Sequence, residues 1–241
     1  MDKTHFHTIE KNASSHWWYQ GRQRILSQIL HSFPLPKNSQ ILEMGCATGE
    51  NLEWLKDFGH LTGIEPDSWA VMKAKQKKIG HIYMGSLPNN MPNISETFDL
   101  VTLLDVLEHI DNDMLALKVL KKWLKPNGYM LITVPAYSFL WSSLDEINHH
   151  KRRYTRNQLH DCLTQNGYSV EYISYFNTFL FPLIYTFRLI DRFLGNSKHS
   201  DVNVSRVGNY ILETIFSLEH RWIPQKIFYF GVSLAAVVKK K

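Results

Sequence analysis

Apolar segments of strand length alternate with helix-like stretches between residues 39 and 135. The apolar segments, which we predict to be strands, are residues 39–44, 61–65, 81–84, 98–104 and 129–134. Such alternation is typical of β-α-β units, in which parallel strands are covered by helices. Residues 98–104 are almost all apolar, as expected for a strand that is covered on both faces. The pattern therefore predicts an α/β fold.

Capping and turn residues predict where the helices between these strands begin and end. A helix is expected to follow the first strand, over residues 51–58. Asp67 or Ser68 would cap the next helix, which Gly80 would end. Asp111 would cap a third helix, ended by the Pro-Asn-Gly turn at residues 126–128.

The second half of the chain is less regular. Thr155 and Gln158 form a capping-box pattern, and Asn166-Gly167 predicts the end of the helix that they begin. Residues 168–174 alternate like a strand, and residues 231–238 predict a last strand.

Length and composition limit the class of protein. The chain has 241 residues, 44% hydrophobic and 20% charged, which fits one globular domain and excludes a disordered or fibrous protein. Its two cysteines, Cys46 and Cys162, offer no disulfide framework, and the first twelve residues lack the apolar core of a secretory signal. The most apolar later run, residues 179–187, is shorter than the roughly 20 residues that span a bilayer. These features predict a cytoplasmic protein, and the net charge of +5 permits an anionic partner or membrane surface without requiring one.

The clearest chemical signal follows the first strand, where residues 41–52 read ILEMGCATGENL. Glycines such as Gly45 and Gly49 allow a backbone to turn tightly and to approach a ligand closely. Glu65 ends the second strand, 20 residues after Gly45. In nucleotide-binding α/β folds an acid at that position accepts hydrogen bonds from the ribose hydroxyls. The loop and the acid together predict a ligand that contains a nucleoside.

The same loop argues against the two common phosphate-binding motifs. A dinucleotide fingerprint would have glycines where this chain has Ala47 and Glu50, and the carboxylate of Glu50 would repel a pyrophosphate. The P-loop pattern G-x-x-x-x-G-K-[ST] does not occur in the sequence. A nucleoside without phosphates fits better, and a cationic sulfonium would tolerate Glu43 and Glu50 nearby.

Four segments together resemble the class I S-adenosylmethionine-dependent methyltransferases, in the broad bacterial group that includes the ubiquinone-biosynthesis methyltransferases. They are ILEMGCATGENL (41–52), LTGIEPD (61–67), FDLVTLLDVLEHIDN (98–112) and LKPNGYMLITVP (124–135). The later segment GVSLAAVVKK resembles the reversed last strand of this family. The resemblance implies a doubly wound, Rossmann-like, mostly parallel sheet with a reversed last strand and helices on both faces. It also implies S-adenosylmethionine as the cofactor.

The resemblance further implies which residues contact this cofactor. Glu43 and the loop from Gly45 to Gly49 would surround its methionyl end, Glu65 would bind the ribose, and Ser86 would face the adenine. Ser86 stands where many members have aspartate, and Ala47 replaces the usual middle glycine. The expected cofactor-binding residues are Glu43, Gly45, Cys46, Ala47, Gly49, Glu65, Pro66, Ser86, Asp105, Val106 and His109.

Plainer interpretations are open for three of these residues. Glu43 could be a strand-end acid that caps the following helix, and His109 could be only a helix-entry residue. Cys46 fits a small filler in the turn, because nothing near it supplies a partner for nucleophilic or metal chemistry.

Acceptor chemistry is expected in residues 136–154, because ligands of α/β sheets lie beyond the carboxyl ends of strands. This segment carries Asp145, His149, His150, Arg152, Arg153 and Tyr154 within ten residues. We predict a substrate lid framed by Trp141 and Tyr154, with His150, His149 and Asp145 as catalytic candidates and His150 as the preferred base. A solvated basic loop is the plainer alternative. A metal site is not predicted, since adjacent histidines rarely face one ion.

Two further segments carry clustered aromatic residues. Residues 15–22, SHWWYQGR, either pack a leading helix onto the sheet or form an aromatic cover over the active site, with Arg22 available to pair with a carboxylate. Residues 175–194 either form a hydrophobic helix in the core or a dimer interface, or lie at a membrane surface where a lipid-like substrate enters. Residues 195–205 are polar and aperiodic and are expected to form a loop.

These inferences divide one domain into a helical cover (1–38), a cofactor-binding core (39–135) and a substrate side (136–241). The substrate side would hold the lid, a helical insertion at about 175–222 and the closing strand. The expected substrate contacts are Trp17, Trp18, Arg22, Trp141, Arg153 and Tyr154.

The expected function is methyl transfer from S-adenosylmethionine to a small-molecule or lipid-like acceptor, at oxygen. The alternatives are a non-catalytic S-adenosylmethionine-binding or interaction protein, and a methyltransferase that acts on an amine or protein. Nucleic acid is not an expected partner, because the sequence shows no recognisable stacking platform of aromatic and basic residues. A peripheral membrane contact is compatible with the sequence.

Overall fold

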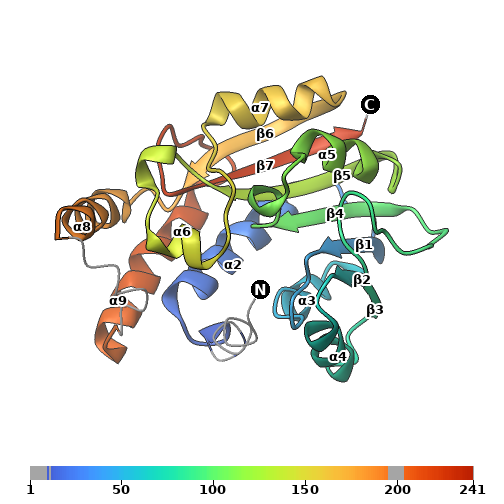
Figure 1. Ribbon diagram of the computed structural model, residues 1–241, viewed down its shortest axis with the longest axis horizontal. Coiled ribbons are helices and arrows are strands. Elements are labelled where there is room, and N and C mark those ends of the chain that lie inside the picture. Colours follow the sequence, from blue (N-terminus) through green and yellow to red (C-terminus); the bar gives the residue numbers. More distant parts are fainter. Residues whose placement is uncertain (1–9, 11, 195–203, 241) are drawn as a thin grey trace.

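The computed structural model describes residue 10, residues 12–194 and residues 204–240, and its seven strands form one sheet in the order β3-β2-β1-β4-β5-β7-β6. Five strands are mutually parallel: β1 (Ser39–Met44), β2 (Gly59–Glu65), β3 (His81–Met84), β4 (Phe98–Leu104) and β5 (Leu124–Pro135). β7 (Ser233–Lys240) is antiparallel both to β5 and to β6 (Tyr168–Phe176). The sheet is therefore mostly parallel with a reversed last strand, as the resemblance implied (Figure 1).

Helices cover both faces of this sheet. The helices and 3-10 turns are α2 (Trp17–His31), α3 (Leu52–Leu55), α4 (Ser68–Gln76), η1 (Leu107–His109), α5 (Asp113–Lys121), η2 (Ser138–Leu140), α6 (Ser143–Ile147), α7 (Arg156–Gln165), α8 (Phe181–Leu194), α9 (Arg206–Ser217) and η3 (Leu218–Arg221). On one face α5 and α7 bury Leu117, Leu120 and Leu159 against the strands. On the other face α2 and α9 bury Ile25 and Phe216. The prediction of a doubly wound α/β fold is confirmed.

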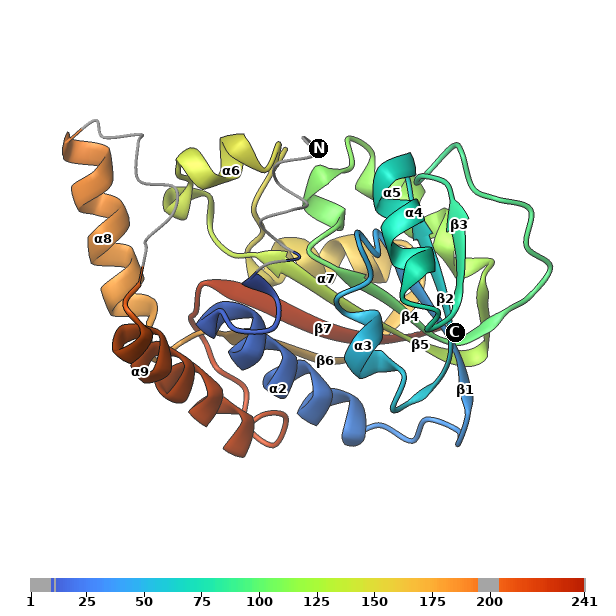
Figure 2. The ribbon, with the colours of Figure 1, turned by 90° about the horizontal axis from the view of Figure 1, so that it is seen from below.

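α2 and α9 lie against each other on the same face of the sheet (Figure 2). Gly21 of α2 faces the ring of Phe216 so closely that a Cβ atom at position 21 would overlap it. Arg24 pairs with Glu213 at 2.8 Å, and the side chain of Asn209 accepts a hydrogen bond from the backbone N–H of Trp17. The leading helix is therefore packed onto the fold by residues nearly two hundred positions away.

Several predicted boundaries differ from the observed ones. Asn112, not Asp111, caps α5, because its side chain accepts a hydrogen bond from the N–H of Leu115 while Asp111 pairs with Lys151. β5 begins at Leu124 rather than at residue 129. The Pro-Asn-Gly sequence at residues 126–128 therefore lies within the bounds of β5 and does not end α5. α4 ends at Gln76, before Gly80, and α3 is only one turn long.

Other local predictions are confirmed. Asp67 caps α4 by accepting hydrogen bonds from the N–H groups of Trp69 and Ala70. Thr155 and Gln158 form the expected capping box of α7, and Asn166 is the C-cap that follows its last residue.

α8 projects from the body of the protein rather than packing in its core (Figures 1 and 2). Leu183, Phe187 and Ile190 of this helix are each about half exposed. This exposure contradicts the interpretation of a core helix for α8, whereas Tyr175 and Phe176 of the same predicted segment are buried at the end of β6. Most of the predicted linker, residues 195–203, lies outside the described residues. No helix in the described part of the chain is both long and apolar enough to cross a membrane.

Candidate active site

The loop after β1 has the tight backbone that its glycines predicted. Gly45, Ala47 and Gly49 all have positive φ angles, of +69°, +47° and +89°. A Cβ atom on Gly45 would lie 2.8 Å from Cγ2 of Val106, which follows β4. Both the φ angle and the close approach explain why glycine is needed at position 45. The loop therefore lies directly against the carboxyl end of β4.

Glu65 holds the same loop from the end of β2. Its Oε2 atom accepts a hydrogen bond from the N–H of Ala47 at 2.9 Å, and its Oε1 atom accepts one from the N–H of Asp67 at 3.1 Å. Burial raises the pKa of this carboxyl, and the two backbone donors act in the opposite direction. Each carboxylate oxygen keeps a second lone pair, so Glu65 can still accept hydrogen bonds from a ligand.

Glu43, at the end of β1, is buried with an unpaired oxygen. Its Oε1 atom accepts a hydrogen bond from the side-chain amide of Asn51 at 2.8 Å, whereas Oε2 has no hydrogen-bond partner among the described residues. Burial raises the pKa of Glu43 to about 8. Glu43 makes no capping contact with the first turn of α3, because it bonds the side chain of Asn51 rather than a backbone N–H.

Arg22 of α2 reaches the same edge of the sheet and pairs with a carboxylate of the protein itself. Its Nη2 atom lies 2.7 Å from Oδ2 of Asp105, the residue that follows β4. Weaker contacts of 3.4 Å join the guanidinium to Thr133 and Asn51, and it lies 5.0 Å from the ring centroid of Trp18. Arg22 was predicted to contact the substrate, whereas in the structure it is buried and pairs with Asp105 of the protein itself.

These residues fit the amino-acid end of S-adenosylmethionine. The unpaired oxygen of Glu43 can accept a hydrogen bond from an ammonium group, the carboxylate of Asp105 offers negative charge to an ammonium or sulfonium group, and Arg22 offers positive charge to a carboxylate. A depression of about 340 Å³ lies further along the edge, between the loop after β3 and the turn after β4. Ser86 stands at the start of that loop, where its backbone pairs with Asn90. β2, which Glu65 ends, lies between β1 and β3 in the sheet, so Glu65 is placed for the ribose that would join adenine to the sulfonium.

Asp145 and His150 form a hydrogen-bonded pair after β5. Oδ1 of Asp145 lies 2.8 Å from Nδ1 of His150, and Arg153 binds both carboxylate oxygens, at 2.7 and 3.0 Å. Although burial raises the pKa of Asp145, the hydrogen bonds from His150 and Arg153 hold it well below its usual value. Asp145 is fully buried, so it orients His150 and has no exposed surface for contact with a substrate.

The other edge of His150 faces two residues of the turn after β4. Its ring lies 4.8 Å from that of His109, and its Nε2 atom lies 3.9 Å from Oε1 of Glu108. His149 is exposed, and its φ of +56° marks the turn that separates it from its neighbour. The two adjacent histidines therefore occupy different surroundings.

The segment 151–154 is fastened to the turn after β4. The N–H of Lys151 donates to the carbonyl of Glu108 at 2.8 Å, and Arg152 pairs with Asp113 at 3.0 Å. The hydroxyl of Tyr154 donates to Asp113 at 2.8 Å, and its ring belongs to the hydrophobic core. The structure therefore corrects the predicted substrate roles of Tyr154 and Arg153, since burial and internal bonds give both a supporting position.

Of the aromatic candidates, Trp17 and Trp18 of α2 are both partly buried against the core, whereas Trp141 is exposed. Trp18 stacks with Arg22 beside Asp105, whereas Trp17 packs against Phe216 of α9 at 5.8 Å between ring centroids. Trp141 is 36% exposed, directly after η2. Trp18 and Trp141 therefore remain the better candidates for contact with a substrate among the predicted tryptophans.

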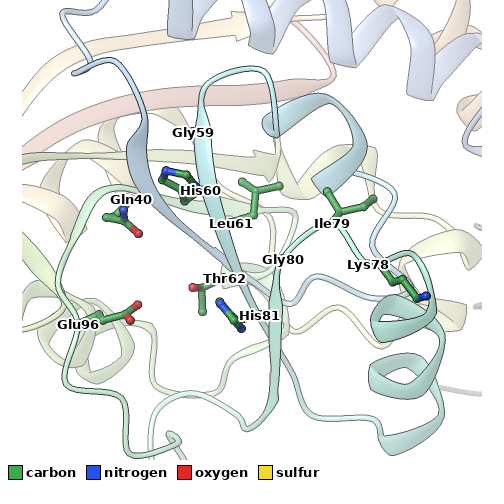
Figure 3. Close-up of a pocket in the computed structure, with 10 residues that line it drawn as sticks. All are labelled: Gln40, Gly59, His60, Leu61, Thr62, Lys78, Ile79, Gly80, His81 and Glu96. Carbon is green, nitrogen blue, oxygen red and sulfur yellow. The ribbon is translucent and has the colours of Figure 1, made fainter.

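A larger cavity, of about 500 Å³, lies at the opposite edge of the sheet, where β1, β2 and β3 begin (Figure 3). Its lining residues are Gln40, Gly59, His60, Leu61, Thr62, Lys78, Ile79, Gly80, His81 and Glu96. None of the predicted site residues is among them. The volume of a cavity is therefore a poor guide to the active site here, because the larger cavity lies at the amino ends of the strands and the predicted site residues lie at the carboxyl ends.

Three residues of the site escaped the sequence-based prediction. Asn51 and Thr133 connect Glu43, Arg22 and Asp105, but nothing in the sequence marks them as partners. Glu108 lies in the segment LEHI, which carried the family resemblance, and that segment could have drawn attention to it.

The fold and this edge of charged residues define a Rossmann-like S-adenosylmethionine-dependent methyltransferase of class I. A family model described as a methyltransferase domain matches residues 17–173, so the chain belongs to this family of methyltransferase domains. A search of curated proteins returned no match. The enzyme class and the cofactor predicted from the resemblance are thus confirmed.

Solved structures of similar fold have low sequence identity to this chain. An S-adenosylmethionine-dependent methyltransferase from Archaeoglobus fulgidus is 18% identical with a TM-score of 0.60, and the match covers 99% of this chain and all of that one. A chain from the complex of the Trm112 methyltransferase activator with a methyltransferase of Haloferax volcanii is 14% identical, with a TM-score of 0.62 and coverage of 98% and 92%. A protein described as a sarcosine dimethylglycine methyltransferase, from Galdieria sulphuraria, is 12% identical, with a TM-score of 0.61 and coverage of 91% and 86%. At these identities the similarity supports the fold.

Proposed function

We propose that this enzyme methylates a hydroxyl oxygen of a small-molecule or lipid-like acceptor, as a member of the bacterial group that includes the ubiquinone-biosynthesis methyltransferases. The observation that carries the proposal is the Asp145–His150 pair. A hydroxyl must lose its proton to become a good nucleophile, and a histidine held by a carboxylate is suited to accept it. An amine acceptor that is already neutral would not need such a pair.

The chemistry divides between the cofactor and the residues of this chain. When bound, S-adenosylmethionine would supply the methyl group: the acceptor oxygen would bond to the methyl carbon as the carbon–sulfur bond breaks, and S-adenosylhomocysteine would leave with the electron pair of that bond. Glu43, Asp105 and Glu65 would hold the cofactor, and Nε2 of His150 would receive the proton of the acceptor hydroxyl. Asp145 accepts the Nδ1–H of the same ring, which fixes the tautomer with Nε2 free to act as a base.

A second set of residues favours an acceptor with a large apolar part. Tyr137, after β5, stacks on Phe139 and Tyr175 at 4.8 and 4.9 Å between ring centroids, and Phe181 begins α8 beside them. Arg188 of α8 donates a hydrogen bond to the carbonyl of Leu140, so this helix is tied to the segment that carries the catalytic candidates. The exposed apolar side chains of α8 continue outward from this aromatic cluster. Such an arrangement suits a lipid-like molecule that is taken from a membrane surface.

The test is to incubate the purified protein with methyl-labelled S-adenosylmethionine and separate lipid, small-molecule and protein fractions of a cell extract. We expect label in the lipid or small-molecule fraction, on an oxygen atom identified by mass spectrometry. Label on nitrogen would replace the proposal by an amine acceptor, and label in the protein fraction would replace it by a protein acceptor. His149→Ala serves as the matched control for His150→Ala in the same assay.

A further inference from the structure

The turn after β4 and the segment after α6 bring three metal-ligating side chains together. Glu108 and His109 belong to η1, and His150 lies 41 residues further along the chain. One carboxylate oxygen and one ring nitrogen from each histidine all lie within 4.8 Å of one another. The sequence argued against a metal site because His149 and His150 are adjacent. The structure instead pairs His150 with His109.

Glu108 is the residue of this cluster that most needs a partner. Its side chain is fully buried, and neither carboxylate oxygen has a hydrogen-bond partner among the described residues. The 3.9 Å between its Oε1 atom and Nε2 of His150 is too long for a hydrogen bond. A buried carboxylate without donors is costly, and a bound cation would remove that cost.

His150 is already oriented as a metal ligand. Asp145 holds its Nδ1 atom at 2.8 Å, which leaves Nε2 directed toward Glu108 and His109. A histidine bound to metal commonly donates its other ring N–H to a carboxylate in this way. Arg153 in turn fixes Asp145 through two hydrogen bonds, so the orientation of the ring does not depend on the ion.

We infer that Glu108, His109 and His150 bind one divalent transition-metal ion. Two imidazoles and one carboxylate suit ions such as Zn²⁺, Co²⁺ or Mn²⁺ better than Ca²⁺ or Mg²⁺, which prefer oxygen ligands. Atoms bound to one such ion at about 2.0–2.2 Å lie no more than about 4.4 Å apart. Small rotations of the three side chains therefore suffice to bring the cluster to that spacing.

Three protein ligands leave positions open for a substrate oxygen. This part of the inference rests on the proposed function. An acceptor hydroxyl in an open position would lose its proton more readily, because the positive ion stabilises the resulting alkoxide or phenolate. The oxygen–hydrogen bond breaks, the proton goes to solvent water, and the oxygen keeps the electron pair that attacks the methyl group. Nε2 of His150 then holds the ion instead of receiving the proton.

The experiment is a titration of the chelator-treated protein with Co²⁺, followed by calorimetry and by visible absorption. We expect one saturable Co²⁺ ion for each chain. Glu108→Gln, His109→Asn and His150→Asn should each weaken Co²⁺ binding by at least about 100-fold, while the neighbouring His149→Ala leaves it unchanged. Thermal unfolding without metal shows which variants fold, and His109→Asn, at a partly exposed position, serves if the buried Glu108→Gln does not.

The outcomes separate this inference from the proposed function. Absence of saturable binding, or wild-type Co²⁺ affinity in both Glu108→Gln and His109→Asn, would overturn the metal site. Methyl transfer to a hydroxyl by rigorously metal-free protein would overturn the role of the ion but leave the proposed function intact. Specific Co²⁺ binding that the three variants abolish would support the site even if no hydroxyl product were found, which would instead count against the proposed function.

Discussion

The two halves of the carboxyl edge of the sheet are held together in different ways. On the cofactor side, Glu65 bonds the backbone of the loop after β1, and the geometry depends on main-chain N–H groups and glycine φ angles. On the acceptor side, several contacts run between side chains of distant segments, such as those of Tyr154 and Arg152 with Asp113. Backbone contacts tolerate changes of side chain elsewhere, whereas side-chain contacts do not. The acceptor side can therefore change in sequence while the cofactor side is kept, so that one cofactor site can accompany many acceptor sites.

The strongest way to separate the two halves is to change His150. We expect His150→Ala to lower turnover by roughly 10²–10⁴-fold. The variant lacks the base that would accept the proton of the acceptor hydroxyl, or a ligand of the ion that would promote loss of this proton. The affinity for S-adenosylhomocysteine, measured by calorimetry, should change little. Equal losses of turnover and of cofactor affinity would show that the two halves are not separate. His149→Ala, at the exposed neighbouring position, is the control.

The converse change is in Glu65. We expect Glu65→Ala to weaken S-adenosylhomocysteine binding by roughly 100-fold, since hydrogen bonds to a charged group contribute about 1.5–3 kcal/mol. Loss of the bond to the N–H of Ala47 would loosen the loop as well. Glu53→Ala, on the exposed side of α3, should leave binding unchanged. Unaltered calorimetric affinity in Glu65→Ala would remove this residue from the cofactor site.

The pH dependence of binding tests Glu43. Burial raises the pKa of Glu43 to about 8, with Arg22 lowering it and the charges of Glu50 and Glu65 raising it, so the carboxyl is mostly protonated at pH 7. A cationic ligand favours the ionised form, so binding below pH 8 must release a proton. Affinity should therefore rise by up to about tenfold for each pH unit as pH approaches 8 from below, and should level off above it.

Glu43→Gln provides the reference for that slope, because the ligand amino group also titrates near pH 8. Calorimetry in two buffers of different ionisation enthalpy measures the proton release directly. The same slope in wild type and variant would mean that Glu43 does not meet the positive end of the ligand.

The smallest effect is expected on α8. Leu183→Glu and Phe187→Glu would each remove exposed apolar surface from this helix, and we expect about a tenfold or smaller loss of turnover with a lipid acceptor held in vesicles. Turnover with a detergent-dispersed short-chain acceptor should be unaffected. Met72→Glu, at a similarly exposed apolar position on α4, is the matched control. Equal loss with both acceptors would indicate a role of α8 other than contact with a lipid surface.

The parallel half of the fold could be predicted because its signals are local. A buried strand has a continuous apolar run, and the loop of Gly45 and the cap of Asp67 depend on residues close in sequence. The cap of α5 was misplaced by one residue because Asp111, Asn112 and Asp113 are all good capping residues. Their tertiary contacts distinguish them, since Asp111 pairs with Lys151 and Asp113 with Arg152 and Tyr154.

Site residues could be predicted from the sequence only where the position in the fold indicates the function of the residue type found there. Glu65 could be singled out from its place at the end of the second strand, and the structure places its carboxylate against the loop after β1, while its contact with a ribose stays a prediction. The pair of Arg22 with Asp105 joins positions 83 residues apart, and no periodicity connects them. Tyr154 was predicted to contact the substrate, but its ring belongs to the hydrophobic core and its hydroxyl donates a hydrogen bond to Asp113. Burial depends on the tertiary fold and cannot be read from neighbouring residues.

The place of β7 in the sheet has a consequence for how the protein is made. β7 lies between β5 and β6, and within the described sheet β6 pairs with no other strand. On the ribosome, β6 therefore emerges before β7, the strand with which it pairs in the described sheet. α8 and α9 are synthesised between the two strands. At translation speeds of about 5–20 residues per second this interval lasts several seconds, during which the facing edges of β5 and β6 are open to other chains. The nascent protein is therefore most prone to aggregate after β6 has left the ribosome and before β7 has inserted.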